Sequence, residues 1–212
     1  MKHFFFIASI LAVLAVNSAR AQSLPLNQLP MYGEVEKTEK LKTSDTSFIA
    51  AIEQQYSSRK EGAKQVVLSG WSYWQKQDRA TAMSRFNQAW LLDPENGDAY
   101  HGFALATAER GGSPTDVERL FKLAVSKPLV APIALVDYGR FLRTQKRLDE
   151  SMAQLNQALL LSFTALNARS NISFVYFLKG DFVSACWWAK DAQKNNDELE
   201  KGYLEDICGR AG

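Results

Sequence analysis

Apolar residues recur every three to four positions from Phe48 almost to the C-terminus, and glycine, proline and small polar residues interrupt them at short intervals. This period is that of amphipathic helices that bury one face. No run bounded by turn residues alternates apolar and polar positions, as a half-buried strand would. The pattern predicts an all-α protein in which helices are joined by short turns.

Capping residues mark where several of these helices start. Ser44 precedes the first apolar stripe, and Ser58 with Glu61 three positions later forms a capping box. Ser113 followed by Pro114 combines a cap with proline at the first helical position. We therefore expect helices to begin near these three serines.

The helices form pairs that repeat at a nearly constant spacing. The small position in the first helix of each pair is occupied by Gly70, Ala104, Gly139 and Ser173. The matching position in the second helix is occupied by Ala82, Val117, Ser151 and Ala185, and every step is 34 or 35 residues. Such a period is typical of solenoids, in which each pair buries its apolar face by stacking on its neighbours. The predicted units are 63–96, 97–131, 132–165 and 166–199.

This repeat resembles that of the tetratricopeptide repeat family, which has Leu-Gly and Tyr in its first helix, Ala, Phe and Ala in its second, and a closing Pro. The first unit matches at Gly70, Tyr73, Ala82, Phe86, Ala89 and Pro94. The fourth unit has Arg169 where a large apolar residue is usual. The resemblance implies an α-solenoid of about four helical hairpins, with a concave inner face. Capping helices are expected at both ends of the domain 44–212, the C-terminal one over about residues 196–209.

Two segments precede the repeats. Residues 1–21 are typical of a secretory signal peptide, because the apolar run from Phe4 to Val16 leads to a small-x-small site at Ala19 and Ala21. At about 13 residues this run is short of the roughly 20 that span a bilayer, which favours cleavage over an uncleaved anchor. We expect export, to the periplasm or outside the cell, and no membrane insertion after cleavage.

Residues 22–43 contain two prolines and a charged stretch, which favours a flexible leader. The alternative is that its apolar residues fold back onto a groove or dock a partner. These residues are Leu26, Leu29, Met31 and Tyr32.

Charge and composition exclude several classes of partner. The whole chain has a formal charge of +2, and loss of Lys2 and Arg20 with the signal would leave it near zero. Nucleic acids and anionic membranes both require a basic surface, so neither is the expected main partner. No metal-ligand cluster, phosphate-binding glycine loop or nucleophile elbow is present, so we expect no enzyme activity and no cofactor.

The chain has two cysteines, Cys186 and Cys208. In an exported protein an even number of cysteines favours a disulfide, here one that ties the last helix to the hairpin before it. Two buried thiols that behave as small apolar side chains are the alternative. Two cysteines with no histidine nearby make a poor zinc site.

The family resemblance implies which residues face a partner, because the first helix of each pair lines the concave groove. The candidates on these helices are Trp71, Trp74, His101, Arg140, Arg143, Phe174 and Phe177. Trp and Arg are enriched in binding hot spots, and Arg can hold a carboxylate through two hydrogen bonds. Such a set suits a peptide with apolar side chains and a carboxylate.

Alternatives remain for each candidate. The tryptophans could pack in the core or under the capping helix or leader, and the two phenylalanines could be core residues. Arg140 and Arg143 could pair with Asp137 or be solvated, and His101 could be a polar groove residue without a ligand.

The sequence thus predicts a non-catalytic scaffold that binds a protein or peptide in the cell envelope, in assembly of an envelope, secretion or pilus machine. A periplasmic chaperone or holdase is one alternative. The other is a structural subunit of an oligomer, because the oligomeric state stays open.

Overall fold

A computed structural model describes residues 24–128 and 130–212, which contain ten α-helices, two short 3-10 helices and no strand. This confirms the predicted all-α solenoid. The predicted signal peptide, residues 1–21, lies outside the described residues. Within the described residues, none of the helices combines the length and the apolar character needed to cross a membrane.

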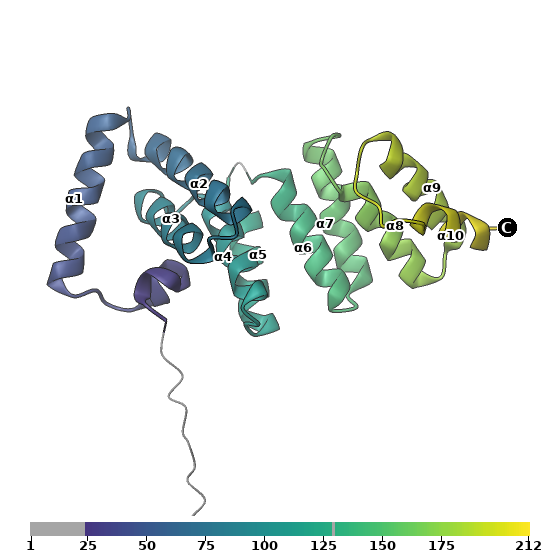
Figure 1. Ribbon diagram of the computed structural model, residues 1–212, viewed down its shortest axis with the longest axis horizontal. Coiled ribbons are helices and arrows are strands. Elements are labelled where there is room, and N and C mark those ends of the chain that lie inside the picture. The colour runs from purple at the N-terminus through teal and green to yellow at the C-terminus, as the bar shows by residue number, and fades with distance from the viewer. Residues whose placement is uncertain (1–23, 129) are drawn as a thin grey trace, which may run out of the picture.

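Eight of the helices form four antiparallel hairpins that follow one another along the molecule (Figure 1). The hairpins are α2 (Arg59–Gln75) with α3 (Arg79–Leu92), α4 (Gly97–Glu109) with α5 (Pro114–Ser126), α6 (Pro132–Thr144) with α7 (Leu148–Leu161), and α8 (Ala168–Lys179) with α9 (Phe182–Lys194). Helix α1 (Glu39–Gln55) lies at one end of the stack and α10 (Tyr203–Arg210) at the other.

The helix starts follow the predicted caps with one exception. Ser58 Oγ accepts a hydrogen bond from the Glu61 amide at 3.2 Å, and Ser113 Oγ accepts one from the Asp116 amide at 3.1 Å. Ser44 caps no helix, because α1 begins at Glu39 and the Ser44 hydroxyl donates to the Lys40 carbonyl instead. The predicted start of the first helix is therefore six residues too late, more than one and a half turns.

Small residues let the two helices of each hairpin approach closely. A Cβ on Gly70 would lie 2.6 Å from the Phe86 ring, and one on Gly139 would lie 2.8 Å from Leu155 Cγ. Ser151 and Ser173 bridge their hairpins by donating to the carbonyls of Gly139 and Ala185, at 2.7 and 2.8 Å. The repeated small position thus sets the packing distance.

Residues 26–34 differ from the expected flexible leader. They form the 3-10 helices η1 (Leu26–Gln28) and η2 (Pro30–Glu34), which pack against α3, the second helix of its hairpin. Met31 is buried in the same apolar cluster as Phe86 and Phe103. The fold-back alternative is the better description, although the segment lies mainly on α3 and only to a lesser extent on α4, a first helix.

Arg169 occupies an apolar position of the repeat without leaving a buried charge alone. Its side chain is 2% exposed, and its Nε donates to Asp191 at 2.8 Å. Its Nη2 donates to the Phe163 carbonyl at 2.7 Å, and the guanidinium lies 4.5 Å from the Phe163 ring centre. The side chain fills the apolar space, and the ion pair satisfies part of its head group.

The C-terminal cap is shorter than predicted but occupies the expected place. Helix α10 begins at Tyr203, and Ile207 is its fully buried residue. A disulfide joins Cys186 in α9 to Cys208 in α10, with the two Cα atoms 4.8 Å apart. The last helix is thus linked covalently to the last hairpin.

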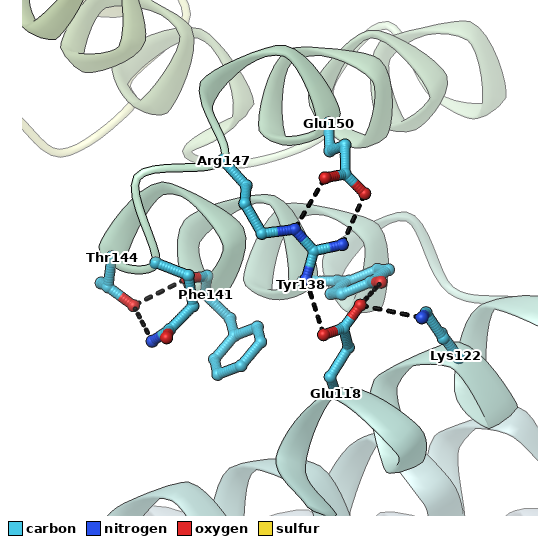
Figure 2. Close-up of polar contacts among 8 residues, drawn as sticks. Glu118, Lys122, Tyr138, Phe141, Thr144, Arg147 and Glu150 are labelled. Atoms are coloured by element: carbon cyan, nitrogen blue, oxygen red, sulfur yellow. Dashed lines mark hydrogen bonds and ion pairs between the residues drawn. The ribbon is translucent and has the colours of Figure 1, made fainter. Parts of the chain in front are cut away.

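Polar contacts (Figure 2) and an aromatic stack join the second hairpin to the third. Glu118 of α5 accepts hydrogen bonds from Arg147 at 2.6 Å and Tyr138 at 3.3 Å, and it pairs with Lys122 at 2.9 Å. The Phe121 and Tyr138 rings stack with their centres 5.4 Å apart. We call Glu118, Tyr138 and Arg147 the α5–α7 junction.

Candidate binding groove

The two predicted tryptophans lie together on α2. Their ring centres are 6.3 Å apart in an edge-to-face arrangement. Trp71 also contacts Phe86 and His101, with ring centres 4.8 and 4.9 Å away, while the Arg79 guanidinium lies 3.9 Å from the centre of the Trp74 ring. Both tryptophans are only partly buried, so each keeps a surface that a partner could contact.

His101 does not present its ring to a partner. It is 2% exposed, and its Nε2 pairs with Asp137 Oδ2 at 2.8 Å. Its inclusion in the binding groove is therefore corrected, because it lies between the Trp71 and Phe121 rings inside the stack. Its role is to join α4 to α6.

The pairing of Asp137 with His101 leaves the two arginines of α6 without that carboxylate. Arg140 is exposed, and Arg143 is half-buried with its guanidinium 5.0 Å from the Phe174 ring centre. Arg143 Nε is buried and has no hydrogen-bond partner within the described residues. Burial, together with the nearby charge of Arg140, holds the pKa of Arg143 below its ordinary value. An acceptor supplied by a ligand would remove the cost of this unsatisfied donor.

Arg140 and Arg143 line a pocket of about 340 Å³ that lies between α6, α8 and the segment that follows α9. Its lining consists of Arg140, Arg143, Asn167, Ser170, Asn171, Phe174, Glu198, Leu199 and Glu200. The repeat period placed the α6 and most of the α8 residues on this face. It carried no information on residues 198–200, because their path depends on how the C-terminal segment folds back.

Phe174 and Phe177 are partly buried by other parts of the chain. Tyr203 of α10 stacks on Phe174 with ring centres 4.3 Å apart, and its ring lies 6.3 Å from that of Phe177. These contacts favour the alternative in which both phenylalanines are core residues. Only Phe174 also borders the pocket.

The chemical character of the candidate groove therefore changes along its length, from apolar and aromatic on α2 to cationic on α6. On α2, Trp71 and Trp74 are accompanied by Leu68, which is 59% exposed and one turn before Trp71. On α6 the accessible groups are the guanidinium groups of Arg140 and Arg143. Among residues 24–128 and 130–212, no group of three or more His, Cys, Asp or Glu residues could hold a metal ion.

Comparison with known proteins gives matches in structure alone. No protein-family model matches the sequence, and no curated protein matches it significantly. PilF of Pseudomonas aeruginosa superposes with a TM-score of 0.64 at 20% identity, over 72% of this chain and 70% of PilF. PilW, a type IV pilus biogenesis factor, does so with a TM-score of 0.55 at 16% identity, over 82% of this chain and 89% of PilW. MamA matches with a TM-score of 0.52 at 15% identity, over 76% of this chain and 96% of MamA.

These similar structures are all tetratricopeptide-repeat proteins. The chain has the tetratricopeptide-repeat fold. At sequence identities of 15 to 20%, the similarity shows a shared fold and no shared function. Any binding role of the groove residues therefore rests on their own geometry.

Proposed function

We propose that this tetratricopeptide-fold chain is a non-catalytic scaffold that binds an extended segment of another protein in its concave groove. The observation that carries the proposal is the half-buried Arg143, whose Nε lacks a partner within the described residues, in a pocket that also contains Arg140. Trp71 and Trp74 provide partly accessible aromatic surface on α2. A segment with an apolar side chain for α2 and a carboxylate for α6 would complement both parts.

We place this scaffold in the cell envelope, in assembly of an envelope, secretion or pilus machine. The predicted signal peptide supports export. The structural likeness to PilF and PilW is consistent with such a role, and PilW is described as a type IV pilus biogenesis factor.

Partner capture tests the proposal. Protein beginning at Gln22 is immobilised and exposed to an envelope extract, beside a Trp71→Ala/Arg140→Glu variant. Loss of two anchors should lower the amount of captured partner at least about tenfold, because a hot-spot residue typically contributes about 2 kcal/mol or more. A melting curve verifies that the variant is folded.

The matched control is Trp187→Ala/Lys190→Glu, which makes the same kinds of change on the exposed face of α9. It should capture as much partner as the unchanged protein. Equal capture by the groove variant and this control would refute the groove proposal.

One observation favours the chaperone alternative. Leu160 and Phe163, at the turn from α7 to α8, are 86% and 72% exposed. Exposed apolar residues of this size can hold unfolded segments. A chaperone would suppress aggregation of several unrelated client proteins, whereas retention of a single stoichiometric partner would contradict that function.

A further inference from the structure

The segment between α9 and α10 follows an unusual path for a turn between repeats. It comprises the eight residues 195–202, whereas the turns that join the earlier hairpins contain four to six. It crosses the first turn of α8, where Asp197 accepts a hydrogen bond from the Ser170 amide at 3.1 Å. The Glu198 amide donates to the Asn167 side chain at 2.8 Å. The segment is therefore docked on the N-terminal end of α8 in the fourth hairpin.

This docked segment brings acidic groups to the arginine pocket. Glu198 and Glu200 form part of the pocket wall together with Arg140 and Arg143. Two carboxylates and two guanidinium groups thus share one small space, and their formal charges balance. In the part of the chain that the structure describes, neither glutamate forms an ion pair with these arginines, and Arg143 Nε has no hydrogen-bond partner.

The C-terminal end of the segment is held more firmly. Tyr203 stacks on Phe174 and shares a hydrogen bond of 2.9 Å with the Ser173 hydroxyl. The Cys186–Cys208 disulfide fixes α10 behind it. Asn196 and Gly202, at the two ends of the segment, both have positive φ angles of 60° and 82°. Residues of this kind can act as pivots, so the segment can move while α10 stays in place.

We propose that residues 196–202 are an internal occupant of the C-terminal end of the groove, and that an acidic segment of the partner displaces Glu198 and Glu200 from the wall of the pocket that Arg140 and Arg143 also line. This inference rests on the proposed groove function and adds to it an autoinhibitory contact and a partner chemistry. The bound segment is acidic, with Leu199 between its two glutamates. A partner segment with acidic residues around an apolar one has the same complementarity to the pocket.

Competition between residues 196–202 and a partner segment can be measured with an acidic peptide that has an apolar residue between its glutamates. The probe is a fluorescein-labelled peptide with the sequence of residues 196–204, and the protein is purified after expression of the full chain. The Glu198→Gln/Glu200→Gln variant should bind the probe about fivefold more tightly than the unchanged protein, because each removed charge competes with the probe by a fraction of a kcal/mol to about 1 kcal/mol. Adding Arg143→Gln to this variant should abolish the gain.

The matched control is Glu36→Gln/Glu205→Gln, which removes the same charge at two exposed positions outside the pocket. It should bind the probe like the unchanged protein. Equal affinities of the unchanged protein, the Glu198→Gln/Glu200→Gln variant and the control, or no binding to any of them, would overturn the inference.

Amide hydrogen exchange gives a second readout. A saturating amount of the probe should accelerate exchange in residues 196–202 of the unchanged protein, because the segment leaves its site. Unchanged or slower exchange there would also overturn the inference. If these tests fail while the Trp71→Ala/Arg140→Glu variant still loses its partner, the proposed function stands without the internal occupant.

Discussion

Asn87 decides where the N-terminal segment lies. Its side chain is fully buried in α3 and makes three hydrogen bonds to the backbone of that segment. It accepts from the Tyr32 amide at 3.0 Å and donates to the carbonyls of Asn27 and Leu29 at 3.0 and 2.8 Å. These bonds hold a turn in which Met31 and Tyr32 have left-handed backbone angles, at a cost of about 1–2 kcal/mol each. One amide side chain thus offsets local strain.

Replacement of Asn87 by alanine should lower the free energy of unfolding by about 2 kcal/mol, because three buried hydrogen bonds are lost and backbone groups are left unpaired. Urea denaturation measures the change. Asn156→Ala on the exposed face of α7 is the control and should shift stability by no more than about 0.5 kcal/mol. An equal effect of the two substitutions would contradict the assigned role.

The Arg169–Asp191 pair explains how a charged residue is tolerated at an apolar repeat position. Asp191→Ala should cost about 2–3 kcal/mol, because it leaves the buried guanidinium without its counter-ion. Arg169→Leu/Asp191→Ala should recover most of this loss, because leucine restores the apolar residue of the repeat pattern. Thermal or urea unfolding of the three proteins measures both effects. A double variant as unstable as Asp191→Ala alone would show that the pair is not the cause.

At the scale of elements, the α5–α7 junction joins the second hairpin to the third. Glu118 is its centre, because it receives hydrogen bonds from Arg147 and Tyr138 and pairs with Lys122 (Figure 2). Hydrogen bonds from Arg147 and Lys122 lower the pKa of Glu118 to about 2 from its ordinary value of 4.5. The folded state therefore favours the ionised carboxylate more than the unfolded state does.

This shift has a defined consequence for stability. The contribution of Glu118 is present above pH 4.5, and it is lost as the pH falls from there towards about 2. Glu118→Gln should be less stable than the unchanged protein at pH 7, and the difference should shrink in this acidic range. Urea unfolding at a series of pH values measures it, with the exposed Glu205→Gln as the control. A difference independent of pH would exclude the carboxylate as its source.

The disulfide makes α9 and α10 one covalent unit. Its cysteines are 22 residues apart, and closing a loop of this size stabilises a protein by roughly 3 kcal/mol in the chain-entropy account. Cys186→Ser/Cys208→Ser should lose about this much in urea unfolding. Thiol counting in denaturant without reductant gives a direct check: the structure requires no free thiol, and two free thiols would refute the bond.

At the scale of the whole molecule, each hairpin touches only its neighbours, so the effect of a substitution should depend on its place in the stack. Phe103 is fully buried in the central apolar cluster, whereas Ile52 belongs to a small cluster that holds α1 against α2. Phe103→Ala should cost about 3–5 kcal/mol and accelerate amide exchange across the second hairpin and its neighbours.

Ile52→Ala should cost less and accelerate exchange mainly in α1, because this helix has one neighbour in the stack. Hydrogen exchange followed by mass spectrometry compares the two variants. Equal spread of faster exchange from both sites would mean that the stack unfolds as one unit and would contradict this account.

The sequence by itself determined the repeat. Gly70, Gly139, Ser151 and Ser173 identify the hairpins because close helix packing accepts only small side chains at those positions. A requirement for a small side chain that recurs at a regular interval can be recognised in the sequence without a structure. The same regularity identified α2 and α6 as the helices that carry Trp71 and Arg140.

Only the tertiary structure decided which of these side chains remain accessible. His101 is removed from the groove by its pairing with Asp137, 36 positions away in the sequence, and Phe174 is covered by Tyr203. Asn87 holds a segment nearly 60 positions away. Such pairings lie outside the repeat, because the segments before and after a solenoid follow no period and are placed by side-chain contacts that form only in the folded chain.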